Sequence, residues 1–246
     1  MQFISGLPQG VYVGQTQIQH PRALASTSSA LAGFNLALHV NDQTARVQQH
    51  RMMLLDQLSV YGVNKITWMR QTHSTLCHTV NHQQSFNERE GDGLVTQLAG
   101  HALMMMTADC LPVVLGNANG TEVANLHAGW RGLANGIIEN TIEQMQSQPT
   151  WAWLGAAISQ PCFEVGTEVK QVFCEKYPPL ESAFESGKQF GKYQADLYAI
   201  ARYILGLYGV KVVLGGDQCS YRQSDRYYSY RRDPQAGRMA SFAFMA

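Results

Sequence analysis

Asn125-Leu-His-Ala-Gly-Trp-Arg-Gly132 joins a predicted strand to a predicted helix. The apolar run 123–126 is typical of a buried strand, and apolar residues recur at helical spacing over 133–145. The two glycines of the stretch let the chain turn tightly between these elements. His127 therefore lies at the carboxyl end of a strand, where α/β proteins form clefts. The stretch predicts an α/β fold with a candidate site at His127, although a lone histidine in a turn is also typical of a half-buried structural residue.

The composition indicates a protein with a large core and no strong charge. Of the 246 residues, 45% are apolar and 15% are charged, and the formal net charge is zero. A neutral chain has no global field to attract nucleic acid or an anionic membrane, so we expect neither as a partner. The first residues lack the basic and apolar regions of a signal peptide, and no apolar run reaches the length of a transmembrane helix, so we expect neither. Five scattered cysteines, an odd number, favour free thiols in a reducing cytoplasm.

Periodic apolar runs predict strands and helices along the whole chain. We expect strands at 11–13, 65–70, 76–80, 92–96, 102–107, 151–158 and 211–214. We expect helices at 45–59, 133–145, 166–176 and 197–205, and a polar loop at 81–90. The side chains expected at the surface are Arg46, Arg51, His20, His50 and His101. The chain contains no repeat and no linker, so we predict one mixed α/β domain over residues 1–246.

Three residues that bind metals well share one setting in the sequence. His73, Cys110 and His127 each follow a strand-like apolar run, so one sheet edge can bring them together. Two imidazoles and a thiolate suit zinc and also copper, and three ligands leave a fourth position open, as in catalytic sites. Their spacing is a weak signal by itself. The run Met104–Met106 is typical of core filling, with a copper-binding methionine box as the alternative.

Several motifs together resemble one known family, the laccase-domain or YfiH-like family. Its signature segments resemble Gln71–His73, Ala108–Val113 and His127–Gly132. Further similarity lies at Asn35–His39, Phe163–Gly166, Gly215–Asp217 and Tyr228–Asp233, so the resemblance covers nearly the whole chain. It implies a single compact domain with layers of mixed β-sheet flanked by helices. It also implies that His73, Cys110 and His127 bind zinc, with copper as the alternative metal.

The resemblance implies activity on purine nucleosides. Members phosphorolyse adenosine, inosine, guanosine and methylthioadenosine, and also deaminate adenosine. Deamination needs a metal that activates water and a group that moves protons, for which Asp109 is a candidate alongside Cys110 and His127. A turn or helix cap is the alternative role for Asp109. Phosphorolysis needs cations for phosphate and polar groups for the nucleoside; the candidates are Asn35, His39, Arg70, Gln71, Arg131, Arg232 and Arg238.

Two departures from the family pattern concern substrate contacts. Thr16–Arg22 lacks the usual paired glycines, so an arginine of the pocket is either missing or displaced to Arg22, and Gly155-Ala156 stands where Gly-Pro is usual.

The alternative functions are an amidase that removes L-serine from UDP-MurNAc-L-serine and a copper-dependent polyphenol oxidase. The latter needs a trinuclear cluster, but the eight histidines include no His-x-His pair. We expect small-molecule partners, namely a nucleoside and phosphate, for a monomer or homodimer.

Overall fold

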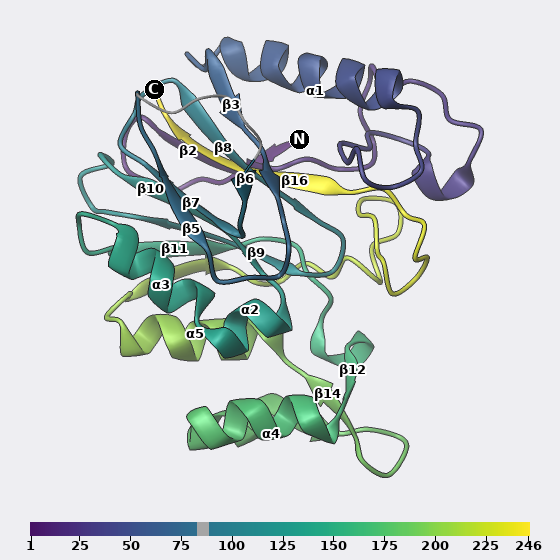
Figure 1. Ribbon diagram of the computed structural model, residues 1–246, viewed down its shortest axis with the longest axis vertical. Helices are drawn as coiled ribbons and strands as arrows, with labels where there is room; N and C mark the ends of the chain where they lie inside the picture. The colour runs from purple at the N-terminus through teal and green to yellow at the C-terminus, as the bar shows by residue number, and fades with distance from the viewer. Residues whose placement is uncertain (83–88) are drawn as a thin grey trace.

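Two β-sheets pack face to face, and helices cover the outer face of each, in the computed structural model (Figure 1). The structure describes residues 1–82 and 89–246, so residues 83–88 of the predicted polar loop lie outside it. The five-stranded sheet has the order β1-β2-β16-β8-β3. Its strands are β1 (Gln2–Phe3), β2 (Val11–Gln15), β16 (Met239–Met245), β8 (His101–Thr107) and β3 (Lys65–Thr67).

The six-stranded sheet has the order β15-β11-β9-β10-β7-β5. Its strands are β15 (Val212–Gly215), β11 (Trp151–Leu154), β9 (Leu111–Gly116), β10 (Val123–Ala128), β7 (Gly93–Thr96) and β5 (Cys77–Val80). Smaller sheets pair β12 (Glu164–Gly166), β14 (Lys192–Ala195) and β13 (Phe184–Ser186), and separately β4 (Met69–Arg70) with β6 (Arg89–Glu90). The result is the predicted single compact α/β domain, with several sheets and flanking helices.

Each sheet has apolar side chains on both faces because it is covered on both sides. Along β8, Leu103 and Met105 face the second sheet, whereas Ala102 and Met104 face helix α1 (Thr44–Ser59). The period of two in a strand produces this alternation. Met104, Met105 and Met106 are all buried and belong to three different hydrophobic clusters, as expected for core filling. Below the second sheet lie α2 (Trp130–Asn135), α3 (Ile137–Gln144) and α5 (Leu197–Leu207), with α4 (Thr167–Lys176) at the bottom of Figure 1.

Short 3-10 helices complete the chain, at η1 (Ser29–Leu31), η2 (Gln160–Cys162) and η3 (Pro178–Ala183). The predicted helix 133–145 is instead two helices, because Gly136 adopts a φ of 100° and interrupts it.

Predictions of side-chain exposure were wrong at three positions. Arg46 is buried, pairs with Asp42 and donates to three backbone carbonyls. His50 is fully buried between backbone groups, and His101 is also buried.

Candidate metal centre and pocket

His73, Cys110 and His127 converge at the ends of three different strands. His73 follows β4, Cys110 lies between β8 and β9, and His127 is the penultimate residue of β10. One nitrogen or sulfur atom from each lies within 4.8 Å of the other two. Gly129 makes the close approach possible, because a Cβ there would lie 2.9 Å from Cys110 Sγ and 3.2 Å from His73 Cδ2. The three side chains can therefore hold one metal ion, and their donor set of two nitrogens and one sulfur fits zinc or copper.

The backbone is strained at one of these three residues and directly before another. Among residues 1–82 and 89–246, the non-glycine residues with positive φ are His73, at 58°, and Asp109, at 95°. One is a candidate ligand, and the other immediately precedes the candidate ligand Cys110. Such conformations cost free energy and persist only where surrounding structure imposes them, which is commonly at functional sites.

Asp92 organises both histidines, a role that the sequence did not reveal. Its buried carboxylate accepts hydrogen bonds from the backbone N–H groups of Thr72 (3.2 Å), His73 (3.1 Å) and Ser74 (2.7 Å). It also accepts one from His127 Nδ1, at 2.7 Å. This bond leaves His127 Nε2 as the nitrogen for a metal, since a metal-binding histidine usually donates its other N–H to a carboxylate. The only sequence signal was an acidic residue at the start of a predicted strand. In the structure this strand, β7, pairs with β10, which carries His127.

The charges of the cluster are strongly coupled. Burial alone would raise the pKa of Cys110, but the adjacent His127 and His73 outweigh it and lower this pKa to about 6. Burial would lower the pKa of His127, but Cys110 and Asp92 raise it to about 9. For Asp92, burial opposes ionisation, yet hydrogen bonds from His127 and Ser74 lower the pKa to about 2. The site therefore favours a thiolate, which is the form of cysteine that binds metals.

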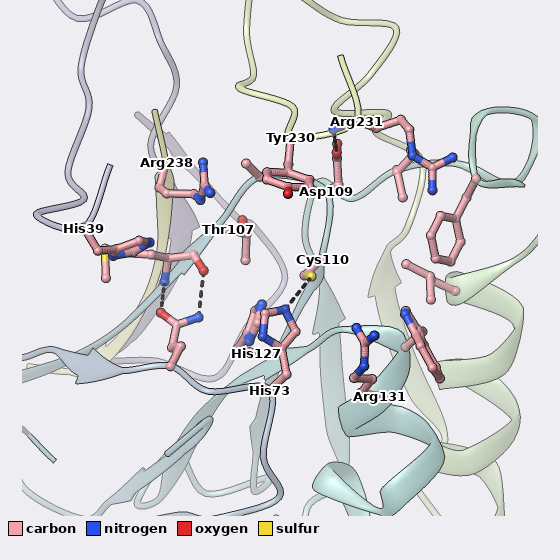
Figure 2. Close-up of a pocket in the computed structure, with 17 residues that line it drawn as sticks. His39, His73, Thr107, Asp109, Cys110, His127, Arg131, Tyr230, Arg231 and Arg238 are labelled. Atoms are coloured by element: carbon pink, nitrogen blue, oxygen red, sulfur yellow. Dashed lines mark hydrogen bonds between the residues drawn. The ribbon is translucent and has the colours of Figure 1, made fainter. Parts of the chain in front are cut away.

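The cluster lies in a pocket of about 470 Å³ that is lined by polar, aromatic and aliphatic side chains. Figure 2 shows His39, Thr107 and Arg238 on one side of Cys110, and Arg131 on the other. Of the predicted site residues, those that line the pocket are His39, Gln71, His73, Asp109, Cys110, His127, Arg131 and Arg238. Tyr230 and Arg231 also line it and were not predicted as site residues, although they lie in the Tyr228–Asp233 motif.

Other predicted site residues do not line this pocket. Arg70 is exposed and pairs with Glu90. Arg232 donates to the backbone carbonyls of residues 220, 221 and 227, so it holds the C-terminal segment together. Asn35 is fully buried and accepts a hydrogen bond from the backbone of Arg238 at 2.9 Å. Arg22 pairs with Asp56 on the surface, so it does not supply the arginine that the altered N-terminal segment lacks.

Two pocket residues have side chains that already form hydrogen bonds within the protein. The Gln71 amide bonds to both the N–H and the carbonyl of Met106, at 2.7 and 2.8 Å. The buried carboxylate of Asp109 accepts hydrogen bonds from Ser220 Oγ (2.6 Å), Ser229 Oγ (3.0 Å) and the backbone N–H of Arg231 (2.7 Å). These contacts fit the alternative of a structural role for Asp109, because they attach the C-terminal segment to the strand end that carries Cys110.

Comparison with known proteins agrees with this architecture. The family described as multi-copper polyphenol oxidoreductase laccase matches residues 18–246. "Purine nucleoside phosphorylase YfiH" of Escherichia coli (strain K12) is 36% identical over 241 residues, covering 93% of this chain and 97% of the relative. "Adenosine deaminase RL5", from an unknown prokaryotic organism, is 33% identical, covering 83% of each.

Solved structures show the same fold. The Neisseria meningitidis protein NMB0706 has a TM-score of 0.90 at 38% identity, covering 99% of this chain and 98% of that one. YlmD from Geobacillus stearothermophilus has a TM-score of 0.83 at 27% identity, covering 96% and 92%. In the described part of this chain, no helix has the length and apolar character to cross a membrane. The extent of the family match and the identity to its relatives establish that this chain belongs to the laccase-domain family.

Proposed function

We propose that this protein is a zinc-dependent purine nucleoside phosphorylase that also deaminates adenosine. The observation that carries the proposal is the convergence of His73, Cys110 and His127 in a pocket that also contains arginines and aromatic rings. Relatives named purine nucleoside phosphorylase and adenosine deaminase support both activities. The substrate class comprises adenosine, inosine, guanosine and methylthioadenosine.

Different residues of the pocket would bind the metal, orient a ligand histidine, bind phosphate and contact the base. His73, Cys110 and His127 would hold the metal, which when bound supplies a Lewis acid for activating water or polarising a substrate. Asp92 keeps His127 in the tautomer that leaves Nε2 for the metal. Arg238 provides the positive charge that phosphate requires as it attacks C1′, whereas Arg131 lies over the Trp130 ring on the other side of the pocket. Trp130 and Phe163 provide apolar surface for a planar base.

The donor set also bears on the choice between zinc enzyme and copper oxidase. Among residues 1–82 and 89–246, His73, Cys110 and His127 form the single group of three or more potential metal ligands. A multicopper oxidase needs further copper sites beside the first, and the described residues offer no second group for them. We therefore favour zinc and nucleoside chemistry over polyphenol oxidation. The free cysteines suit a reducing compartment, which we propose is the cytoplasm.

Incubation of the zinc-loaded protein with adenosine, with and without phosphate, tests the proposal. Chromatography should detect adenine only when phosphate is present, and inosine in both reactions. Replacement of Cys110 by alanine is the matched control, because it should abolish both products. Absence of both products, together with release of serine from UDP-MurNAc-L-serine, would replace this proposal by the amidase function. Turnover that persists after complete removal of the metal would contradict the metal dependence.

A further inference from the structure

Arg238 is a mostly enclosed cation that faces the pocket without a carboxylate partner. Its guanidinium lies 5.7 Å from the centre of the Tyr230 ring and donates to the backbone carbonyls of Ala236 and Gly237. None of the ion pairs formed among residues 1–82 and 89–246 includes it. Burial lowers the pKa of Arg238, which reflects the cost of enclosing this charge. A cation in such a place is stabilised by an anionic ligand.

The neighbouring acid does not serve as that partner. Asp109 lines the same pocket, but its two carboxylate oxygens accept hydrogen bonds from Ser220, Ser229 and the backbone of Arg231. The Cys110 sulfur belongs to the candidate metal site that it forms with His73 and His127. The Arg238 side of the pocket, which Figure 2 shows beside His39 and Thr107, therefore presents positive charge to whatever enters.

The opposite side of the pocket has a different character. Arg131 lies over the Trp130 ring at 4.4 Å, and Arg231 lies over the Phe163 ring at 5.5 Å. Arg231 also donates to the backbone carbonyl of Glu164. Figure 2 places Arg131 and Arg238 on opposite sides of Cys110. Flat arginine and aromatic surfaces are suited to stacking against a planar base, whereas the Arg238 side offers directed N–H donors.

We propose that the pocket contains two subsites, with inorganic phosphate at Arg238 and the purine base at Trp130 and Phe163, on opposite sides of the metal cluster. This inference rests on the proposed phosphorolysis. In that reaction a phosphate oxygen forms a bond to C1′ while the bond from C1′ to N9 breaks. The electron pair leaves with the purine, which then takes up a proton. An in-line displacement needs the nucleophile and the leaving group on opposite sides of C1′, and Arg238 and Arg131 lie on opposite sides of Cys110.

Two matched arginine variants, Arg238→Met and Arg131→Met, test the assignment in the zinc-loaded protein. Calorimetry measures the Kd of inorganic phosphate, and phosphate-free deamination measures the KM of adenosine. Arg238→Met should raise the phosphate Kd about 10- to 100-fold, because charge-assisted hydrogen bonds are lost, and should leave the KM of adenosine unchanged. Arg131→Met should leave phosphate binding unchanged and raise the KM of adenosine about 2- to 10-fold. Arg238→Lys, which keeps the charge, should give an intermediate phosphate Kd.

The outcomes separate this assignment from the proposed function. Equal loss of phosphate affinity in Arg238→Met and Arg131→Met, or no loss in Arg238→Met, overturns the subsite assignment. Adenosine 5′-monophosphate is a second ligand in the calorimetry, and binding of this ester without binding of inorganic phosphate also overturns it. Arg238-dependent phosphate binding in a protein that never forms free purine would uphold the anion subsite while refuting phosphorolysis.

Discussion

Replacement of Asp92 by asparagine should weaken metal binding by changing the tautomer of His127. One oxygen of Asp92 accepts from the side chain of His127 and the backbone of His73, and the other accepts from Thr72 and Ser74. Asparagine has one carbonyl oxygen and one donor group. If the oxygen remains toward Thr72 and Ser74, the amide donates to His127 Nδ1. The ring proton of His127 then moves to Nε2, the nitrogen that the metal needs.

The magnitude follows from the number of hydrogen bonds affected. A carboxylate that orients a metal-binding histidine contributes about 10- to 100-fold to metal affinity, which corresponds to about 1.4–2.7 kcal/mol. The substitution also leaves the His73 N–H without its acceptor. We therefore expect the free energy of unfolding of the metal-free protein to fall by about 3 kcal/mol, as for loss of charge-assisted hydrogen bonds in a buried site.

Competition with a chromophoric chelator measures zinc affinity, and denaturant unfolding of the metal-free protein measures stability. Glu122→Gln is the matched control. Glu122 is also buried and accepts from Gln146 N–H, Ser147 N–H and Ser147 Oγ, but it does not line the metal pocket. Glu122→Gln should lose stability with zinc affinity unchanged. Wild-type zinc affinity in Asp92→Asn, or equal weakening in Glu122→Gln, would refute the tautomer argument.

Three further predictions concern the cluster and its surroundings. Cys110→Ala should lose stoichiometric zinc, measured by elemental analysis, with a change of under about 1 kcal/mol in metal-free unfolding; retention of one zinc per chain would contradict the ligand assignment. Gly129→Ala should weaken zinc binding, because its Cβ would lie 2.9 Å from Cys110 Sγ. Gly206→Ala, where a Cβ meets nothing within 4 Å, should leave zinc binding unchanged and add about 0.4–1 kcal/mol of stability. The pKa of Asp92 falls from 3.8 to about 2 on folding, so its contribution of about 2 kcal/mol is present above pH 4 and is lost as pH falls through 2. Urea unfolding of the metal-free protein should then show the stability gap between wild type and Asp92→Asn narrowing by about 2 kcal/mol as pH falls from 4 to below 2, and a constant gap would exclude this linkage.

The alternation of apolar residues and the ends of apolar runs made the main architecture predictable. Helix 45–59 and the strands at 102–107 and 123–126 follow local patterns, since a period of two or 3.6 residues reflects burial of one face. His73, Cys110 and His127 could be selected together because each follows such a run, and their side chains do converge in the fold. The helix break at Gly136 was harder to predict, because a single glycine is tolerated within many helices.

The tertiary structure decided which polar residues belong to the pocket. The sequence gives no reason to prefer one of Arg70, Arg232 and Arg238 as a pocket residue, yet only Arg238 among them lines the pocket. Asp92 reaches His127 across 35 residues of chain, and Asp109 holds Ser229 across 120. The local periodicity of apolar residues predicts which face of a helix or strand is buried. The role of a charged side chain depends instead on which segment, distant in sequence, folds against it. The sequence by itself determined the layers and the three candidate metal ligands; long-range packing determined which groups orient these side chains and which arginines line the pocket.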